Sequence, residues 1–151
     1  MNVQQIISRI EGEIADAGSL QEAQQIICNI LSEEVEYYNW VGFYMANKDR
    51  TMLELGAYVG ETTEHTHIPY GKGVCGQVAE SRQVKVVQDV RAEDNYISCS
   101  MNVRSEIVVP MFADGEFVGE IDIDSNTISP FTKDDERLLL RLMELLEEHC
   151  F

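Results

Sequence analysis

"SEIVVPMFADGEFVGEIDIDS", residues 105–125, is the stretch that decides the fold of this chain. Two apolar runs flank the triplet Ala113-Asp114-Gly115, a pattern that predicts a β-hairpin. In the second run, alternation with a period of two places Ile121 and Ile123 on one face of the strand. The other face carries acidic residues, namely Glu120, Asp122 and Asp124. The hairpin therefore predicts an antiparallel sheet with one apolar face and one face rich in carboxylates.

Helical and strand patterns surround this hairpin on both sides. Apolar spacing and capping signals predict two helices over 3–17 and 19–35, followed by two strands over 37–46 and 52–59. A strand end and glycine-rich loop over 61–76 then leads into a short helix over 77–82, a short strand over 85–90 and an irregular segment over 91–104. After the hairpin, a long C-terminal helix is capped by Thr132 and Asp135. Antiparallel hairpins mixed with terminal helices indicate an α+β fold. We expect the terminal helices to pack on one face of the sheet and residues 1–151 to form a single domain.

Composition and charge narrow the classes of function. The chain has 151 residues, of which 11 are basic and 27 acidic, giving a net charge of −16. Nucleic acids and anionic membranes would repel such a protein, because their binding relies on clustered Lys and Arg. The N-terminus resembles no signal peptide, and no apolar run approaches the roughly 20 residues of a membrane span. We therefore expect a cytoplasmic protein whose cysteines stay reduced.

The segment GKGVCG, residues 71–76, spells the G-x-G-x-x-G pattern of dinucleotide loops. That loop belongs between a parallel strand and a helix, whereas this one lies mid-chain in an expected antiparallel fold, so we disfavour a dinucleotide site. His65, His67 and Cys75 together suggest zinc ligands. No C-x-x-C pair accompanies them, and two polar histidines at an exposed strand end are the favoured interpretation. No metal site is predicted.

The four cysteines differ in their surroundings. Cys28 lies within an apolar helix and fits a core residue, and Cys150 is the penultimate residue. Cys75 is expected at the start of the short helix, where backbone N–H groups would stabilise a thiolate. Cys99 lies on the irregular segment, where exposure is plausible. Taken singly, Cys75 and Cys99 fit buried structural residues better than nucleophiles.

The acidic face and an aromatic pair have two interpretations each. Glu106 begins the strand paired with the acidic strand, so the carboxylates either form a solvated sheet face or clamp the ammonium group of a substrate. Carboxylates held close together raise one another's pKa, which would keep one of them protonated as an acid. Trp40 and Tyr44 lie four residues apart on one strand face. They either pack in the core or form an aromatic wall for a ligand.

These segments together resemble the GAF-domain free methionine-(R)-sulfoxide reductase family over nearly the whole chain. The resemblance rests on five motifs: NWVGFY, IPYGKGVCG, CSMNVRSEIVVP, GEIDIDS and FTKDDERLL. It implies a six-stranded antiparallel sheet, with N- and C-terminal helices on one face and a ligand pocket on the other. It also implies an enzyme that reduces free L-methionine-(R)-sulfoxide to methionine with an external thiol reductant such as thioredoxin, and with no bound cofactor.

The resemblance also assigns roles to residues. Cys99 matches the catalytic cysteine and Cys75 a second family cysteine. The substrate-binding positions match Glu106, Asp122, Asp124, Trp40 and Tyr44. The chain departs from the family at His65, which stands where a cysteine usually resolves the catalytic one by forming a disulfide. Cys75 or an outside thiol would then take that step.

An alternative within the same fold is a GAF module that binds a small ligand without catalysis, or that senses oxidants through its thiols. Family members often form homodimers, a state that this sequence does not itself indicate.

Overall fold

A computed structural model of the chain describes residues 1–96 and 102–151. Within these ranges the elements are α1 (Val3–Ile14), α2 (Leu20–Glu34), β1 (Trp40–Ala46), β2 (Met52–Val59), β3 (His67–Pro69), α3 (Gly73–Ser81), β4 (Lys85–Val87), a 3-10 turn (Val90–Ala92), β5 (Ser105–Ala113), β6 (Glu116–Ser125) and α4 (Lys133–Cys150). The central hairpin is present as predicted, with its turn at Asp114 and Gly115, both of which have positive φ.

The six strands form one antiparallel sheet in the order β3-β2-β1-β6-β5-β4. The predicted α+β class and the six-stranded sheet are therefore confirmed. Strand β6 lies at the middle of the sheet, between β1 and β5. Its acidic residues consequently have a neighbouring strand on each side, and they are far from either edge.

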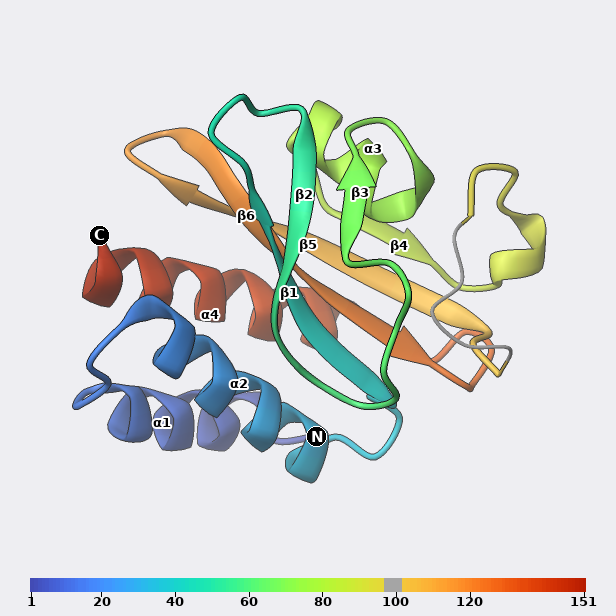
Figure 1. The fold of residues 1–151 in the computed structure, drawn as a ribbon. Coiled ribbons are helices and arrows are strands. Elements are labelled where there is room, and N and C mark those ends of the chain that lie inside the picture. The colour runs from blue at the N-terminus through green and yellow to red at the C-terminus, as the bar shows by residue number, and fades with distance from the viewer. Residues whose placement is uncertain (97–101) are drawn as a thin grey trace.

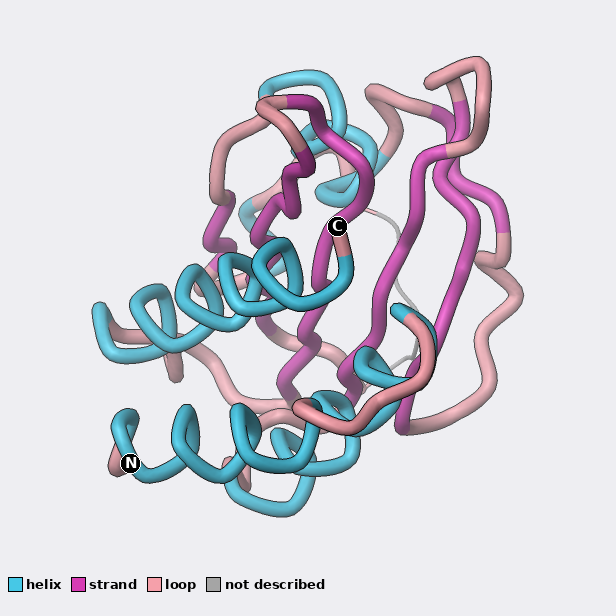
Figure 2. Tube along the Cα trace, turned by 90° about the vertical axis from the view of Figure 1, so that its left-hand side faces the viewer, coloured by secondary structure: helices cyan, strands magenta, loops and turns pink. Residues whose placement is uncertain are grey.

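The long helices α1, α2 and α4 lie together on one face of the sheet, as predicted (Figure 1). Figure 2 shows the same layers after a quarter turn, with the helices that carry the two termini beside the strands. The apolar side chains of the central strands point into this layer: Val41, Phe43, Ile107, Val109, Met111, Ile121 and Ile123. Burial of this apolar surface is the main stabilising contribution to the fold.

The opposite face of the sheet is covered by the short helix α3 (Figure 1). Cys75 and Val78 of α3 join a second buried cluster with Trp40, Tyr44 and Val108 from the strands. The alternation of the strands therefore separates two interiors. One, under the long helices, is mainly apolar, and the other, under α3, contains the acidic side chains of the sheet.

Several element boundaries differ from the sequence-based expectation. Strand β1 begins at Trp40, not at residue 37, because Tyr37 and Tyr38 turn toward α4. Their hydroxyls donate to Asp135 Oδ1 at 2.8 Å and 2.5 Å, while Asp135 also completes the predicted capping box with Thr132. Residues 67–69 form a strand of their own. No helix within the described ranges has the length and apolarity that crossing a membrane requires.

Candidate active site

The carboxylates of the sheet face under α3 are almost completely buried. Glu120 is 0% exposed, Asp122 and Asp124 are 1% exposed, and Glu106 is 3% exposed. The interpretation as a solvated sheet face is therefore wrong. Burial of four acidic side chains under one short helix costs free energy, since charged groups lose their hydration there.

Strand register places these side chains in rows across the sheet. Asp124 pairs with Glu106 on β5 and with Trp40 on β1. One step along β6, Asp122 lies opposite Gly42, and a further step along, Glu120 lies opposite Tyr44. Residues that are distant in the sequence thus form a compact patch because antiparallel pairing aligns the same face of three strands.

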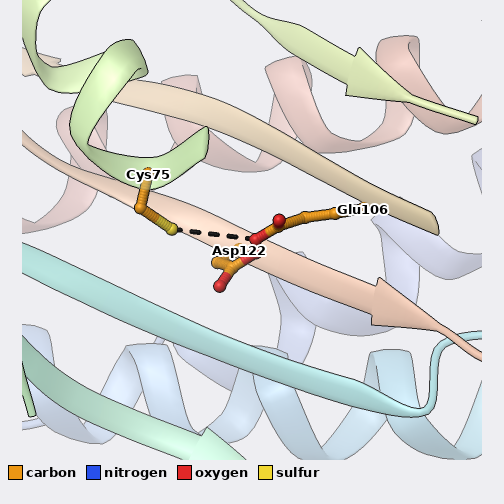
Figure 3. Close-up of side chains that lie close together, drawn as sticks. All are labelled: Cys75, Glu106 and Asp122. Atoms are coloured by element: carbon orange, nitrogen blue, oxygen red, sulfur yellow. Dashed lines mark hydrogen bonds between the residues drawn. The ribbon is translucent and has the colours of Figure 1, made fainter. Parts of the chain in front are cut away.

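Cys75 reaches this patch from the helix above it (Figure 3). Its Sγ donates a hydrogen bond to Glu106 Oε2 at 3.8 Å. One ligand-type atom from each of Cys75, Glu106 and Asp122 lies within 4.8 Å of the other two. Three elements, α3, β5 and β6, therefore converge on one point.

The surroundings of Cys75 disfavour a thiolate. Burial raises the pKa of its thiol well above the ordinary value, and the charges of Asp122, Glu120 and Glu106 raise it further. The expectation that the helix start would stabilise a thiolate is therefore wrong. The partial positive charge of a helix N-terminus is about half an elementary charge, which is outweighed here by desolvation and neighbouring acids.

The carboxyls of Glu120 and Asp122 also have pKa values above their ordinary ones. Burial is the main cause that raises the pKa of both carboxyls, and the neighbouring Asp122 raises that of Glu120 further. Among the described residues, neither Glu120 oxygen has a hydrogen-bond partner, and Asp122 Oδ1 has none either. Glu120 was predicted to lie on the acidic face but was not among the predicted site residues, although it alternates with the apolar residues of the strand just as Asp122 does.

The glycine turn before α3 sets the position of Cys75. Gly71 and Gly73 have φ values of 88° and 67°, which favour glycine. Gly76 approaches the preceding turn so closely that a Cβ would lie 2.6 Å from the carbonyl oxygen of Pro69. The turn follows the short antiparallel strand β3, so it lacks the parallel strand of a dinucleotide loop.

Asn95 ties this turn to the segment that precedes Cys99 in the sequence. Its Oδ1 accepts from the Gly73 N–H at 3.0 Å, and its Nδ2 donates to the Gly71 carbonyl at 2.9 Å. Cys99 itself lies outside the described residues, so its predicted catalytic role has no structural account. Cys28 is buried in the apolar core as predicted, and Cys150 is half-buried.

Two cavities adjoin the buried acids. The larger, of about 170 Å³, is lined by Asn39, Trp40, Glu61, Asn102, Val103, Asp124 and Asn126. The smaller, of about 10 Å³, is lined by His65, Ile68, Lys72, Gly73, Val74, Cys75, Glu106 and Asp122. Glu106 of the smaller cavity and Asp124 of the larger one are register partners on neighbouring strands, so the two cavities lie on adjacent parts of the acidic face.

The predicted aromatic wall is present in part. Trp40 stacks between Tyr44 and Tyr58, with ring centroids 6.3 Å and 5.5 Å away, and its Nε1 donates to the Glu61 carbonyl at 3.0 Å. It therefore presents a fixed indole to the larger cavity. Tyr44 is fully buried beneath it and is absent from the lining of both cavities. Its hydroxyl donates to the His65 carbonyl at 2.8 Å.

The two histidines have different surroundings in the structure. His67 is exposed on β3, with its Nε2 3.5 Å from Glu54 Oε2, whereas His65 lines the smaller cavity with Cys75. The set His65, His67 and Cys75 therefore does not come together as a zinc site, which agrees with the favoured interpretation of the sequence.

The fold and the pocket define the class of protein. The six-stranded sheet, with long helices on one face and a buried site on the other, is a GAF domain, and the GAF domain family matches residues 19–149. The free methionine-R-sulfoxide reductase of Escherichia coli is 37% identical over 79% of this chain and 70% of its own. That of Saccharomyces cerevisiae is 32% identical over 93% and 78%.

A solved structure of a free methionine-R-sulfoxide reductase is also similar to this chain. The free methionine-R-sulfoxide reductase of Neisseria meningitidis, determined in complex with its substrate, superposes with a TM-score of 0.92 at 35% identity and covers 97% of this chain and 87% of its own. Within the GAF-domain proteins, this chain belongs to the free methionine-R-sulfoxide reductase family.

Proposed function

We propose that this chain reduces free L-methionine-(R)-sulfoxide to methionine with electrons from a thiol. The observation that carries the proposal is that a buried carboxylate and a fixed indole, those of Asp124 and Trp40, line one cavity of about 170 Å³. A carboxylate binds the ammonium group of a free amino acid, and an aromatic face packs against its methyl and sulfur end. The reductases of Escherichia coli and Saccharomyces cerevisiae support this assignment of reaction class.

In the proposed reaction, the Cys99 thiolate attacks the sulfoxide sulfur while an acid protonates the departing oxygen. The S–O bond of the substrate breaks and the hydroxyl transfers to the sulfur of Cys99, so that methionine leaves and Cys99 becomes a sulfenic acid. Sulfur of the enzyme is thereby oxidised as sulfur of the substrate is reduced. Asn102 and Val103, which follow Cys99 closely in the sequence, line the larger cavity. Their position is consistent with delivery of the Cys99 thiol to a substrate bound there.

Asp122 is the favoured acid. Burial raises the pKa of its carboxyl, so a protonated form persists at a pH where an exposed aspartate is ionised. Glu106 and Asp124 would then bind the substrate ammonium, as the family resemblance implies. This requirement for a free ammonium explains why a methionine sulfoxide inside a protein would not be accepted.

Cys75 is the proposed resolving thiol. It condenses with the Cys99 sulfenic acid to form a disulfide. Glu106, which accepts the Cys75 thiol hydrogen, takes up this proton and returns it to the departing hydroxyl, which leaves as water. An external dithiol of the thioredoxin type then reduces the disulfide. The reaction needs no metal and no bound organic cofactor, and it suits the reducing cytoplasm.

The test is release of methionine from free L-methionine-(R)-sulfoxide in the presence of dithiothreitol. We expect turnover by the wild type and by Cys150→Ser, which alters a thiol at the far end of α4, but none by Cys99→Ser. The N-acetylated sulfoxide, which lacks the ammonium group, should not be reduced. Absence of methionine release, or equal release from Cys99→Ser, would refute the proposal.

A second candidate function is oxidant sensing or ligand binding without catalysis. The observation that favours it is the combination of His65 in place of a resolving cysteine with a buried, protonated Cys75. Mass spectrometry of thiols after one stoichiometric addition of the sulfoxide separates the two. A Cys75–Cys99 disulfide together with released methionine supports catalysis, whereas thiols that react with peroxide but not with the sulfoxide support sensing.

A further inference from the structure

The wall of the smaller cavity carries three residues of the proposed reaction that also form a set of potential metal ligands. A thiol sulfur and two carboxylate oxygens, from Cys75, Glu106 and Asp122, lie within 4.8 Å of one another, and all three residues are buried. Figure 3 shows the three side chains pointing toward one another from α3, β5 and β6. The cavity of about 10 Å³ is too small for an amino acid and admits a single ion or water molecule.

We propose that Cys75, Glu106 and Asp122 bind a divalent transition-metal ion of the zinc class. Thiolate favours a borderline or soft metal, while Mg²⁺ and Ca²⁺ require six or more oxygen ligands, which this set does not provide. A thiolate and a carboxylate oxygen bound to tetrahedral Zn²⁺ lie about 3.6 Å apart. The observed distance between Cys75 Sγ and Glu106 Oε2 is 3.8 Å, close to that value, and all three ligand atoms lie within 4.8 Å of one another, so the side chains would have to draw together around an ion.

An unsatisfied buried carboxylate oxygen at the same place is an independent observation for a cation. Within residues 1–96 and 102–151, Asp122 Oδ1 lacks a hydrogen-bond partner although Asp122 is 1% exposed, and Asp122 lines this cavity. Lys72 lines the cavity but is exposed to solvent, where its ammonium is hydrated. A dication bound there would offset the negative charge of its ligands Cys75, Glu106 and Asp122.

His65 lines the same cavity, so its imidazole or a water molecule is available as a fourth ligand. Structural zinc sites are almost always four-coordinate. The metal-binding set is thus different from the trio His65, His67 and Cys75, because strand register brings carboxylates, not His67, to the cavity.

Such an ion would act as an inhibitor. It would take Glu106 from the substrate ammonium, and it would hold Cys75 as a metal-bound thiolate that cannot condense with a sulfenic acid. This consequence rests on the proposed function, whereas the binding of the ion does not.

Titration of the reduced, metal-free protein with Co²⁺, a spectroscopic substitute for Zn²⁺, tests the site without any assay of activity. We expect a sulfur-to-cobalt charge-transfer band that saturates at one equivalent and is displaced by Zn²⁺ but not by a large excess of Mg²⁺. The band should vanish in Cys75→Ser and persist in Cys99→Ser and Cys150→Ser. Asp122→Asn, which conserves the shape of the side chain, should weaken the affinity at least about tenfold.

Three results would overturn the proposal. They are the absence of a charge-transfer band in the wild type, a band that survives unchanged in Cys75→Ser, and an affinity unaltered in Asp122→Asn. Circular dichroism of each variant shows whether it is folded. Wild-type protein that binds Co²⁺ but, once freed of metal, reduces no sulfoxide would contradict the proposed function alone, so the two failures are distinguishable.

Discussion

At the scale of single residues, the acids of β6 share one face but differ in what surrounds them. Asp124 borders the larger cavity beside Trp40, and Asp122 borders the smaller one beside Cys75. Glu120 lines neither cavity and lies opposite Tyr44. Under the proposed function, a substrate in the larger cavity would therefore contact Asp124, whereas Glu120 would not contact it.

Asp124→Asn should raise the KM for free methionine sulfoxide more than it lowers kcat. Loss of a charge-assisted hydrogen bond to the ammonium costs about 1.5–3 kcal/mol, which corresponds to roughly a tenfold or larger increase in KM. Steady-state kinetics measure both constants. Glu11→Gln, on α1 across the sheet, removes the same charge far from the site and should leave KM unchanged. An equal fall in kcat with unaltered KM would assign Asp124 to the chemical step instead.

Glu120→Gln should stabilise the protein increasingly as the pH rises. Because the folded state raises the pKa of Glu120 above its ordinary value of 4.5, this residue contributes stability that is complete below that value and is lost as the pH rises toward the folded-state pKa. Gln stays neutral throughout. We expect a gain in unfolding free energy of about 1 kcal/mol near pH 8 and almost none near pH 4.

Urea denaturation of the two proteins in the presence of a chelator, which keeps metal ions from the site, measures this difference. If the gain in unfolding free energy were the same at both pH values, the pKa of Glu120 would not be raised in the folded state.

At the scale of elements, the glycine turn between β3 and α3 decides where Cys75 lies. The turn is held by Asn95 and by the close approach of Gly76 to the backbone of Pro69 and Gly71. Helix α3 begins at Gly73, so the turn residues Gly73 to Gly76 form its first turn. The helix is thereby pressed against the acidic face of the sheet, and Cys75 points at Glu106.

Gly76→Ala should therefore destabilise the protein and lower its reductase activity. The added Cβ would meet backbone atoms at 2.6 Å and 2.9 Å, which cannot move aside as a flexible side chain can. Overpacking of this kind costs about 1–3 kcal/mol. The matched control is Gly12→Ala in α1, whose Cβ has open space around it.

The control should stabilise the protein by about 0.5–1 kcal/mol, because alanine is the better helix former. Unfolding in urea gives both values. If Gly76→Ala were as stable and active as the control, the close approach of the turn would have no role in placing Cys75.

At the scale of the whole molecule, the two faces of the sheet differ in what they bury. The long helices on one face supply the apolar core, and the face under α3 holds the acids and both cavities. Most of the 27 acidic residues remain on the surface, where only 11 basic residues oppose them. The excess acidic side chains therefore repel one another, and this repulsion destabilises the compact folded state.

Added NaCl should raise the melting temperature of the protein. Screening shortens the range of the repulsion to about 10 Å at 0.1 M salt, so the folded state gains stability. A gain of about 1 kcal/mol corresponds to a rise of about 2–4 °C for a domain of this size. Thermal unfolding followed by circular dichroism at low and moderate NaCl measures the shift. A melting temperature that falls with NaCl would mean that attractive surface ion pairs dominate.

Local patterns predicted the elements well because their causes are local. The capping signals at Ser19 and Thr132 and the hairpin turn at Asp114 lie where the sequence placed them. The start of β1 was misplaced, since Tyr37 and Tyr38 fit a strand by composition but bind Asp135, nearly a hundred residues away. Strand β3 was not separated from its loop because three residues carry almost no periodic signal.

The sequence by itself determined the two faces of the sheet, since alternation along β6 fixes which side each residue takes, and its motifs determined the family. The tertiary structure decided whether the acidic face is solvated, because the packing of α3 and of the cluster around it buries these side chains. It also decided that Cys75 is a protonated thiol, since burial and the charges of acids from β5 and β6 outweigh the local effect of a helix start. Hydration and charge act through space, and sequence spacing alone does not measure them.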